Sequence, residues 1–197
     1  MAAGQCTEEA DTWADFAGGL AGKDPFRLTQ FHIHLFWDHL QWSLQVPVQV
    51  QVVPPVLAFG VSRFWTVEVP MTDEEQEVND RQKQSFRKLC KDPVLLLVPV
   101  YDDGAGPGGE HWTLLVVFQE GKDQYQVRYY DTLQAESQSS RARAGAILGQ
   151  LASFKDGLSH VWTGRRNWSR QGPLQCGFFI CWYMEEEARR FLESLGG

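Results

Sequence analysis

Three apolar stretches in the middle of the chain constrain its fold most, because they predict consecutive β-strands. Residues 94–101 are almost entirely apolar, which is typical of a strand at the centre of a sheet with both faces covered. Two further strands are predicted over 112–118 and 125–131, with a short turn between them. That turn is too short for a crossover, so these two strands pair antiparallel. The chain therefore contains a sheet built around an antiparallel hairpin.

Helical patterns lie on both sides of these strands. Thr72 and Glu75 form a capping box that predicts the start of a helix. This helix is expected to run to Cys90, because Asp92 and Pro93 follow it. Further helices are predicted by apolar spacing or helix-forming composition, over 26–44, 137–154 and 176–195. Short strands are expected over 46–52, 61–69 and 161–163.

The length and composition favour one folded domain. The chain has 197 residues, of which 43% are hydrophobic, and this is enough for a sizeable core. Residues 1–24 are small, glycine-rich and acidic, so we expect a poorly ordered N-terminal segment. Residues 25–197 are then expected to form a single domain that acts as a monomer.

Charge and hydropathy argue against two classes of partner. The formal net charge is -7, whereas a nucleic-acid-binding protein normally carries a basic face. No apolar run reaches the ~18 residues that a membrane-spanning helix needs. The N-terminus has neither the basic nor the apolar region of a secretory signal. We therefore expect a cytoplasmic or nuclear protein that binds neither nucleic acid nor membranes.

Cysteine chemistry is the first candidate for a function. The four cysteines form no CxxC pair, and their spacing fits neither a disulfide framework nor a zinc site. Cys176 is notable because it begins the apolar helix predicted over 176–195. Unpaired N–H groups at a helix N-terminus stabilise an anion, and therefore a thiolate. Gly177, the next residue, allows another backbone to approach closely.

A histidine and an aspartate are expected to meet at one end of the predicted hairpin. His111 lies at the entry of the strand over 112–118, and Asp131 lies at the exit of its antiparallel partner. The entry and exit of such paired strands are neighbours, within reach of a side-chain hydrogen bond. A carboxylate beside an imidazole holds it in one tautomer, as a general base requires. Gln171, in the polar loop before Cys176, offers an amide N–H that can donate to an oxyanion.

The order of these residues resembles that of the ubiquitin-like protein-specific proteases. These enzymes act on SUMO and related modifiers, and the adenovirus protease is a distant relative. The motifs that carry the resemblance are the strand over 95–100 with Pro99 inside it, His111-Trp112-Thr113-Leu114, Tyr129-Tyr130-Asp131-Thr132-Leu133, and Gln171 followed by Cys176-Gly177. The resemblance covers about residues 92–187, half of the chain, and in this order the motifs are fairly specific.

The resemblance implies a fold and a set of roles. The fold is α+β, the papain-like cysteine protease fold of the ubiquitin-like protease type. It has a mixed, mostly antiparallel sheet flanked by helices, with the nucleophile at the N-terminus of the last long helix. Cys176 is implied as nucleophile, His111 as general base and Asp131 as the group that orients the base. Gln171 is implied in the oxyanion hole.

The implied reaction is cleavage after the Gly-Gly tail of a ubiquitin-like modifier, with SUMO as the first choice. The modifier is cut either from its precursor or from a conjugate. Trp112 matches the family tryptophan that covers the channel for this tail, and Gly177 allows the substrate backbone to approach. The partner is therefore a ubiquitin-like modifier protein or its conjugates. Neither a cofactor nor a metal is implied.

Departures from the family pattern keep other functions open. Gln175 precedes the cysteine where the family has an aspartate, so either Gln171 or Gln175 can serve the oxyanion hole. The family's N-terminal Trp-Leu-Asn-Asp segment is not evident. Two candidates could replace it: Trp37 with Asp38, or Trp13. A binding module that has lost catalysis is the first alternative. The second is a related acetyltransferase, in which glutamate usually takes the place of the aspartate.

A group of histidines raises a metal site as a further alternative. His32, His34 and His39 lie in the same stretch as Asp38, and their spacing loosely matches a metal site. Aromatic residues between them favour a half-buried helix instead.

Overall fold

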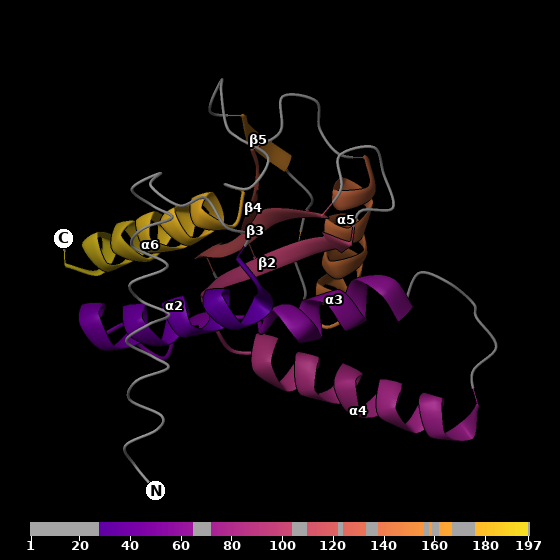
Figure 1. The fold of residues 1–197 in the computed structure, drawn as a ribbon. Coiled ribbons are helices and arrows are strands. Elements are labelled where there is room, and N and C mark those ends of the chain that lie inside the picture. The colour runs from indigo at the N-terminus through magenta and orange to yellow at the C-terminus, as the bar shows by residue number, and fades with distance from the viewer. Residues whose placement is uncertain are drawn as a thin grey trace, which may run out of the picture.

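The computed structural model of the chain shows a β-sheet with helices on both of its faces (Figure 1). The described residues are 28–64, 72–103, 110–121, 124–132, 138–155, 158, 162–166 and 176–196, with the backbone alone described at 63–64, 110 and 162–166. The expected boundary between residues 24 and 25 lies outside these ranges.

Five strands form one mixed sheet within the described ranges, in the order β1-β2-β3-β4-β5. They are β1 (Val50–Val52), β2 (Leu95–Asp103), β3 (Glu110–Gly121), β4 (Gln124–Asp131) and β5 (Trp162–Arg166). The three central strands pair antiparallel, as the apolar stretches predict, and the two edge strands pair parallel with their neighbours. The first six residues of β2 are buried, which confirms its central place.

The parallel edges follow from the connections, because a parallel pair needs a crossover of a dozen or more residues. Between β1 and β2 the chain passes through α3 (Pro55–Phe64) and α4 (Asp73–Cys90). Between β4 and β5 it passes through α5 (Gln138–Ala152). The sequence predicts α4 and α5 within a few residues of these bounds.

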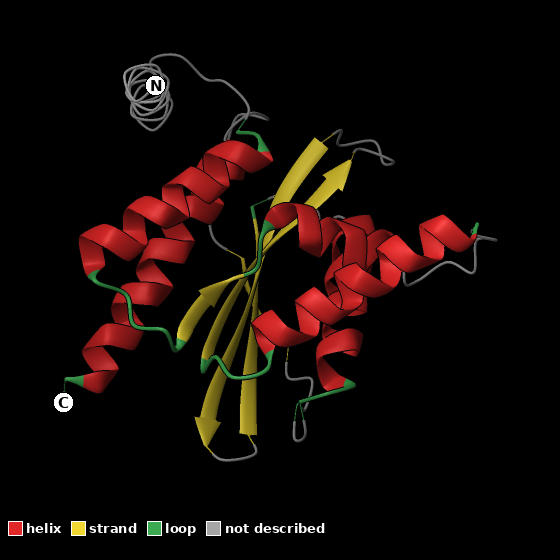
Figure 2. Cartoon of the chain, turned by 90° about the horizontal axis from the view of Figure 1, so that it is seen from below, coloured by secondary structure: helices red, strands yellow, loops and turns green. Residues whose placement is uncertain are grey.

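Two apolar cores lie on the two faces of the sheet (Figure 2). α2 (Gln30–Leu44) and α6 (Cys176–Leu195) cover one face, and α3, α4 and α5 cover the other. Neighbouring residues of β2 serve different cores: Leu95 faces α2 and α6, whereas Leu96 faces the other helices. α6 begins at Cys176, as the sequence predicts. The expected α+β architecture, a mixed sheet flanked by helices, is confirmed.

The capping box sets the start of α4. The hydroxyl oxygen of Thr72 accepts a hydrogen bond from the backbone N–H of Glu75 across 3.3 Å. In return, the Glu75 carboxylate accepts one from the backbone N–H of Thr72 across 2.8 Å. Two N–H groups that the helix itself cannot pair are satisfied in this way.

One of the expected short strands, over 61–69, is wrong for residues 61–64. The chain there continues α3 to Phe64, and the rest of the stretch lies outside the described residues. Pro55 begins α3, where a missing N–H costs nothing. Ala58 and Val61 are both buried in the core beneath α3, three residues apart. The described residues of α3 therefore have helical rather than strand spacing.

Candidate active site

A histidine and an aspartate meet at the end of the sheet where β3 begins and β4 ends. His111 is the second residue of β3, and Asp131 is the last residue of β4. Nε2 of His111 donates a hydrogen bond to Oδ1 of Asp131 across 2.8 Å. Both side chains are 4% exposed, so the pair is shielded from water. The contact expected from the hairpin geometry is therefore present.

A thiol reaches the same histidine from the last helix. Cys176, the first residue of α6, is half-buried, and its side chain interacts with the ring of His111. Because Nε2 of His111 binds Asp131, the nitrogen left for the thiol is Nδ1. The backbone N–H groups of the first turn of α6 have no partner within the helix. The structure thus brings together a thiol, an imidazole and a carboxylate at the N-terminus of α6.

The partners of His111 hold a proton on its ring. Burial alone lowers the pKa of an imidazole, because it disfavours the charged form. The hydrogen bond to Asp131, the interaction with Cys176 and the charges of both groups outweigh burial and raise the pKa of His111 from 6.5 to about 9. The ring is therefore an imidazolium near neutral pH. Such a charge favours the thiolate form of a neighbouring cysteine.

The other described cysteines are buried in the cores. Cys90 and Cys181 are 0% exposed, whereas Cys176 is partly exposed. Burial raises the pKa of Cys90 to about 12, although Lys155 opposes the shift. Burial also raises the pKa of Cys181 well above its ordinary range. Thiols in such surroundings are unreactive, and Cys6 lies outside the described residues.

Trp112 and Gly177, the residues expected to contact substrate, share Leu28 as a neighbour. The indole N–H of Trp112 donates to the carbonyl oxygen of Leu28 across 2.9 Å, and Trp112 is 4% exposed. A Cβ added to Gly177 would come within 2.7 Å of the Cβ of Leu28. The absence of a side chain at Gly177 therefore admits Leu28. Leu28 has no local sequence signal, because its contact with Trp112 spans 84 residues.

Several expected residues fall elsewhere. Gln171, Gln175 and Trp13 lie outside the described residues, so their roles stay predictions. Trp37 is buried in the core beneath α2, and the neighbouring Asp38 is exposed. Trp37 therefore serves the packing of α2 on the sheet.

The histidines of α2 have local partners. Nδ1 of His32 accepts a hydrogen bond from the backbone N–H of Thr29 across 3.1 Å, at the start of α2. Nε2 of His34 lies 3.8 Å from the carboxylate of Asp38. Within the described ranges, no group of three His, Cys, Asp or Glu side chains is placed to hold a metal ion.

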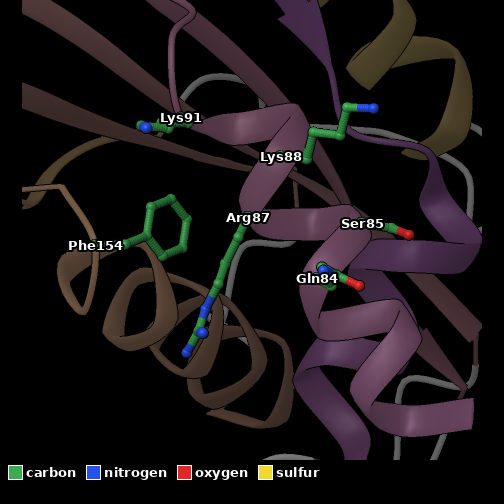
Figure 3. A pocket seen from close by; sticks show the side chains of 6 residues that line it. All are labelled: Gln84, Ser85, Arg87, Lys88, Lys91 and Phe154. Atoms are coloured by element: carbon green, nitrogen blue, oxygen red, sulfur yellow. The ribbon is translucent and has the colours of Figure 1, made fainter. Parts of the chain in front are cut away.

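A surface hollow lies at the C-terminal end of α4 (Figure 3). Its lining residues are Gln84, Ser85, Arg87, Lys88, Lys91 and Phe154. α4 ends beside the start of β2, whereas His111 pairs with Asp102 near the end of β2. The three cationic side chains point in different directions in Figure 3, so they do not converge on one ligand. The hollow is therefore separate from the candidate active site.

Solved structures show which fold this is. XopD, an effector protein of Xanthomonas campestris solved bound to ubiquitin, matches with a TM-score of 0.63 and 20% identity, over 87% of this chain and 79% of that one. The C-terminal Ulp1 protease domain in complex with Smt3, the yeast ortholog of SUMO, matches with a TM-score of 0.58 and 12% identity, over 83% and 66%. The ASFV pS273R protease matches with a TM-score of 0.51 and 14% identity, over 84% and 59%.

No protein-family model and no curated protein matches the sequence. The solved structures are related to the chain by its fold rather than by extensive sequence identity. The chain has the fold of the Ulp1-type cysteine proteases, as its sequence motifs imply.

Proposed function

We propose that the chain is a cysteine protease that cleaves ubiquitin-like modifier proteins after their terminal Gly-Gly. The observation that carries the proposal is the contact of His111 with both Asp131 and Cys176, at the N-terminus of α6. It occurs in a fold shared with proteins solved in complex with ubiquitin and with Smt3. A thiol, an imidazole and a carboxylate in this order are the parts that nucleophilic acyl transfer requires.

In the proposed mechanism, the thiolate of Cys176 attacks the carbonyl carbon of the scissile bond and forms a tetrahedral oxyanion. The imidazolium of His111 gives its proton to the leaving amine, and a thioester remains on Cys176. Neutral His111 then takes a proton from water, and the resulting hydroxide attacks the thioester, releases the acid product and restores the Cys176 thiolate beside the imidazolium. Asp131 keeps the ring oriented, because its bond to Nε2 directs Nδ1 toward the sulfur.

The oxyanion needs hydrogen-bond donors that are in place before the reaction. The backbone N–H of Cys176 is one such donor, because it belongs to the first turn of α6. We assign the second donor to the side chain of Gln171, with Gln175 in the same loop as the alternative.

The proposed substrate is SUMO or a related modifier, as a precursor or as a conjugate. We propose a channel for the Gly-Gly tail beside Trp112, because only glycine passes close to a flat ring without a clash of Cβ. Gly177 faces Leu28, so it supports this site through packing. Ubiquitin in the XopD structure and Smt3 in the Ulp1 structure support a modifier of this class.

The remaining properties of the proposed enzyme follow from its mechanism and composition. Acyl transfer by this triad requires neither a metal nor a cofactor. We propose that the chain acts as a monomer in the cytoplasm or nucleus and binds no nucleic acid, in keeping with its net charge of -7. None of the helices in the described part of the chain combines the length and the apolar character needed to cross a membrane.

Hydrolysis of modifier–fluorophore fusions tests the proposal. Fusions of SUMO, ubiquitin and a Nedd-type modifier, each with Gly-Gly before the fluorophore, are incubated with the protein. We expect release from the SUMO fusion, and a loss of kcat/KM of at least ~10³-fold in Cys176→Ala and in His111→Ala. Cys90→Ala, in the core on the opposite face of the sheet, is the matched control and keeps kcat/KM near that of the wild type. Binding of the fusions without any release would instead favour a binding module.

A further inference from the structure

A carboxylate that the proposed mechanism does not use is buried on α6. Glu187 is 3% exposed. Its Oε2 atom accepts a hydrogen bond from Nη1 of Arg128 across 2.7 Å. Its Oε1 atom accepts one from Nη1 of Arg190, also across 2.7 Å, and another from the hydroxyl of Tyr130. A buried charge costs free energy unless donors satisfy it, and here two guanidinium groups and a hydroxyl do so.

This network joins the two elements that carry the thiol and the carboxylate of the triad. Tyr130, on β4, directly precedes Asp131. Glu187 lies on α6, whose first residue is Cys176. The ring of Tyr130 also stacks on that of Tyr183 of α6, with 4.3 Å between the ring centroids. Any movement of α6 along β4 would therefore break bonds to Glu187 and move Cys176 at the same time.

Directional bonds matter at this interface because much of the packing of α6 on the sheet is apolar. Ile180 and Met184 are fully buried in the core that α6 shares with the sheet. Apolar packing has no preferred direction, so it specifies the register of a helix weakly. Hydrogen bonds between charged groups need defined lengths and angles, and a satisfied buried network selects one arrangement.

We propose that Glu187 is a positioning residue: it holds α6 in register with β4 and so keeps Cys176 in contact with His111. This inference rests on the proposed function. A displacement of about 1 Å is enough to slow a reaction strongly, because the reacting groups must be aligned. Glu185 is the matched control, because it lies two residues before Glu187 on α6 and pairs with Arg189, outside the network.

Alkylation of Cys176 by iodoacetamide tests the inference without a substrate. The rate is followed by peptide mass spectrometry between about pH 5 and about pH 9, a range that contains the ordinary titration of histidine. In the wild type we expect His111 to sustain alkylation near about pH 6, so that His111→Ala slows it there. Glu187→Gln should lower the rate at about pH 6 by about tenfold and move the profile toward that of His111→Ala. Glu185→Gln should follow the wild type.

A second variant guards against misfolding of Glu187→Gln. Tyr130→Phe removes only the hydroxyl bound to Glu187 and keeps the ring that stacks on Tyr183. We expect it to shift the profile in the same direction, by a few-fold, in protein that circular dichroism shows to be folded. A purely structural role would lower the melting temperature and leave the profile unchanged.

The outcomes separate this inference from the proposed function. Profiles of Glu187→Gln and Tyr130→Phe that coincide with the wild type, while His111→Ala differs, would overturn the positioning role alone. A wild-type profile that does not depend on His111 would overturn both the positioning role and the proposed triad.

Discussion

Two thiols on α6 show how surroundings decide the chemistry of a residue. Cys176 is half-buried at the start of the helix and interacts with His111, whereas Cys181 is enclosed by the core. Burial raises the pKa of Cys181 far above its ordinary range, which removes its nucleophilic form. The same helix therefore carries a candidate nucleophile and an inert core residue.

The raised pKa of His111 predicts a pH-dependent contribution to stability. The pKa of His111 is about 9 in the folded chain against an ordinary value of 6.5, so folding favours the protonated ring. This contribution is fully present below pH 6.5 and is lost as the pH rises through about 9. We expect the difference in free energy of unfolding between wild type and His111→Gln to shrink by about 3 kcal/mol over that interval. Urea unfolding at both ends of the interval measures it.

The direction in which this stability difference changes with pH is what tests the raised pKa of His111. The comparison with His111→Gln removes the effect of other groups that titrate in the same interval. A difference that stays constant, or that grows with pH, would show that Asp131 and Cys176 do not hold a proton on the ring.

A contact between residues that one hairpin brings together could be predicted from the sequence. Contacts between segments far apart in the chain could not. The proximity of His111 and Asp131 follows from one hairpin. The contacts of Leu28 with Trp112 and of Glu187 with Tyr130 span 84 and 57 residues, and no local pattern encodes them. Glu187 did carry a weak signal, because it follows buried Met184 by three residues and so lies on the apolar face of the helix.

At the scale of elements, the sequence predicts the ends of helices and strands best where a boundary has a chemical cause. The capping box predicts the start of α4, and a change from a polar loop to an apolar run predicts the start of α6. The strand expected over 46–52 is observed only over Val50–Val52, because its pairing partner β2 begins opposite Val50. The strand predicted over 61–69 is wrong for residues 61–64, because short apolar runs fit a helix and a strand equally well.

The close approach of α6 to Leu28 predicts the effect of a methyl group. In Gly177→Ala the new Cβ would lie 2.7 Å from the Cβ of Leu28, so one of the two segments must shift. We expect a loss of about 1–3 kcal/mol in the free energy of unfolding, measured by urea denaturation. We also expect a lower kcat/KM on the SUMO fusion, because the shift displaces the residue next to Cys176.

Gly149→Ala on α5 is the matched control for this substitution. A Cβ at Gly149 meets nothing within 4 Å, so alanine there should raise the free energy of unfolding by up to about 1 kcal/mol. Equal effects of the two substitutions would show that Leu28 does not restrict Gly177.

At the scale of the whole molecule, one sheet separates two cores with different tasks. The core beneath α2 and α6 contains the contacts that place Cys176, including those of Leu28, Tyr130 and Glu187. The core beneath α3, α4 and α5 lies on the opposite face and contains Cys90. Stability depends on both cores, whereas the position of the thiol depends mainly on the first.

This division of tasks predicts different outcomes for two equivalent substitutions. Ile147 on α5 and Ile180 on α6 are both 0% exposed, one in each core. Replacing either with valine should lower the free energy of unfolding by about 0.5–1.5 kcal/mol. We expect Ile180→Val to reduce kcat/KM on the SUMO fusion as well, and Ile147→Val to leave it unchanged. A similar loss of kcat/KM in both variants would argue against the division.

Covalent trapping tests most directly the claim that Cys176, His111 and Asp131 act as one unit. The protein is incubated with a vinyl-sulfone probe built on a SUMO tail, and the adduct is located by peptide mass spectrometry. We predict a single adduct on Cys176, formed at least ~10²-fold more slowly in His111→Ala and more slowly also in Asp131→Asn. An adduct on Cys181, or labelling of Cys176 that is as fast without His111 as with it, would contradict the claim.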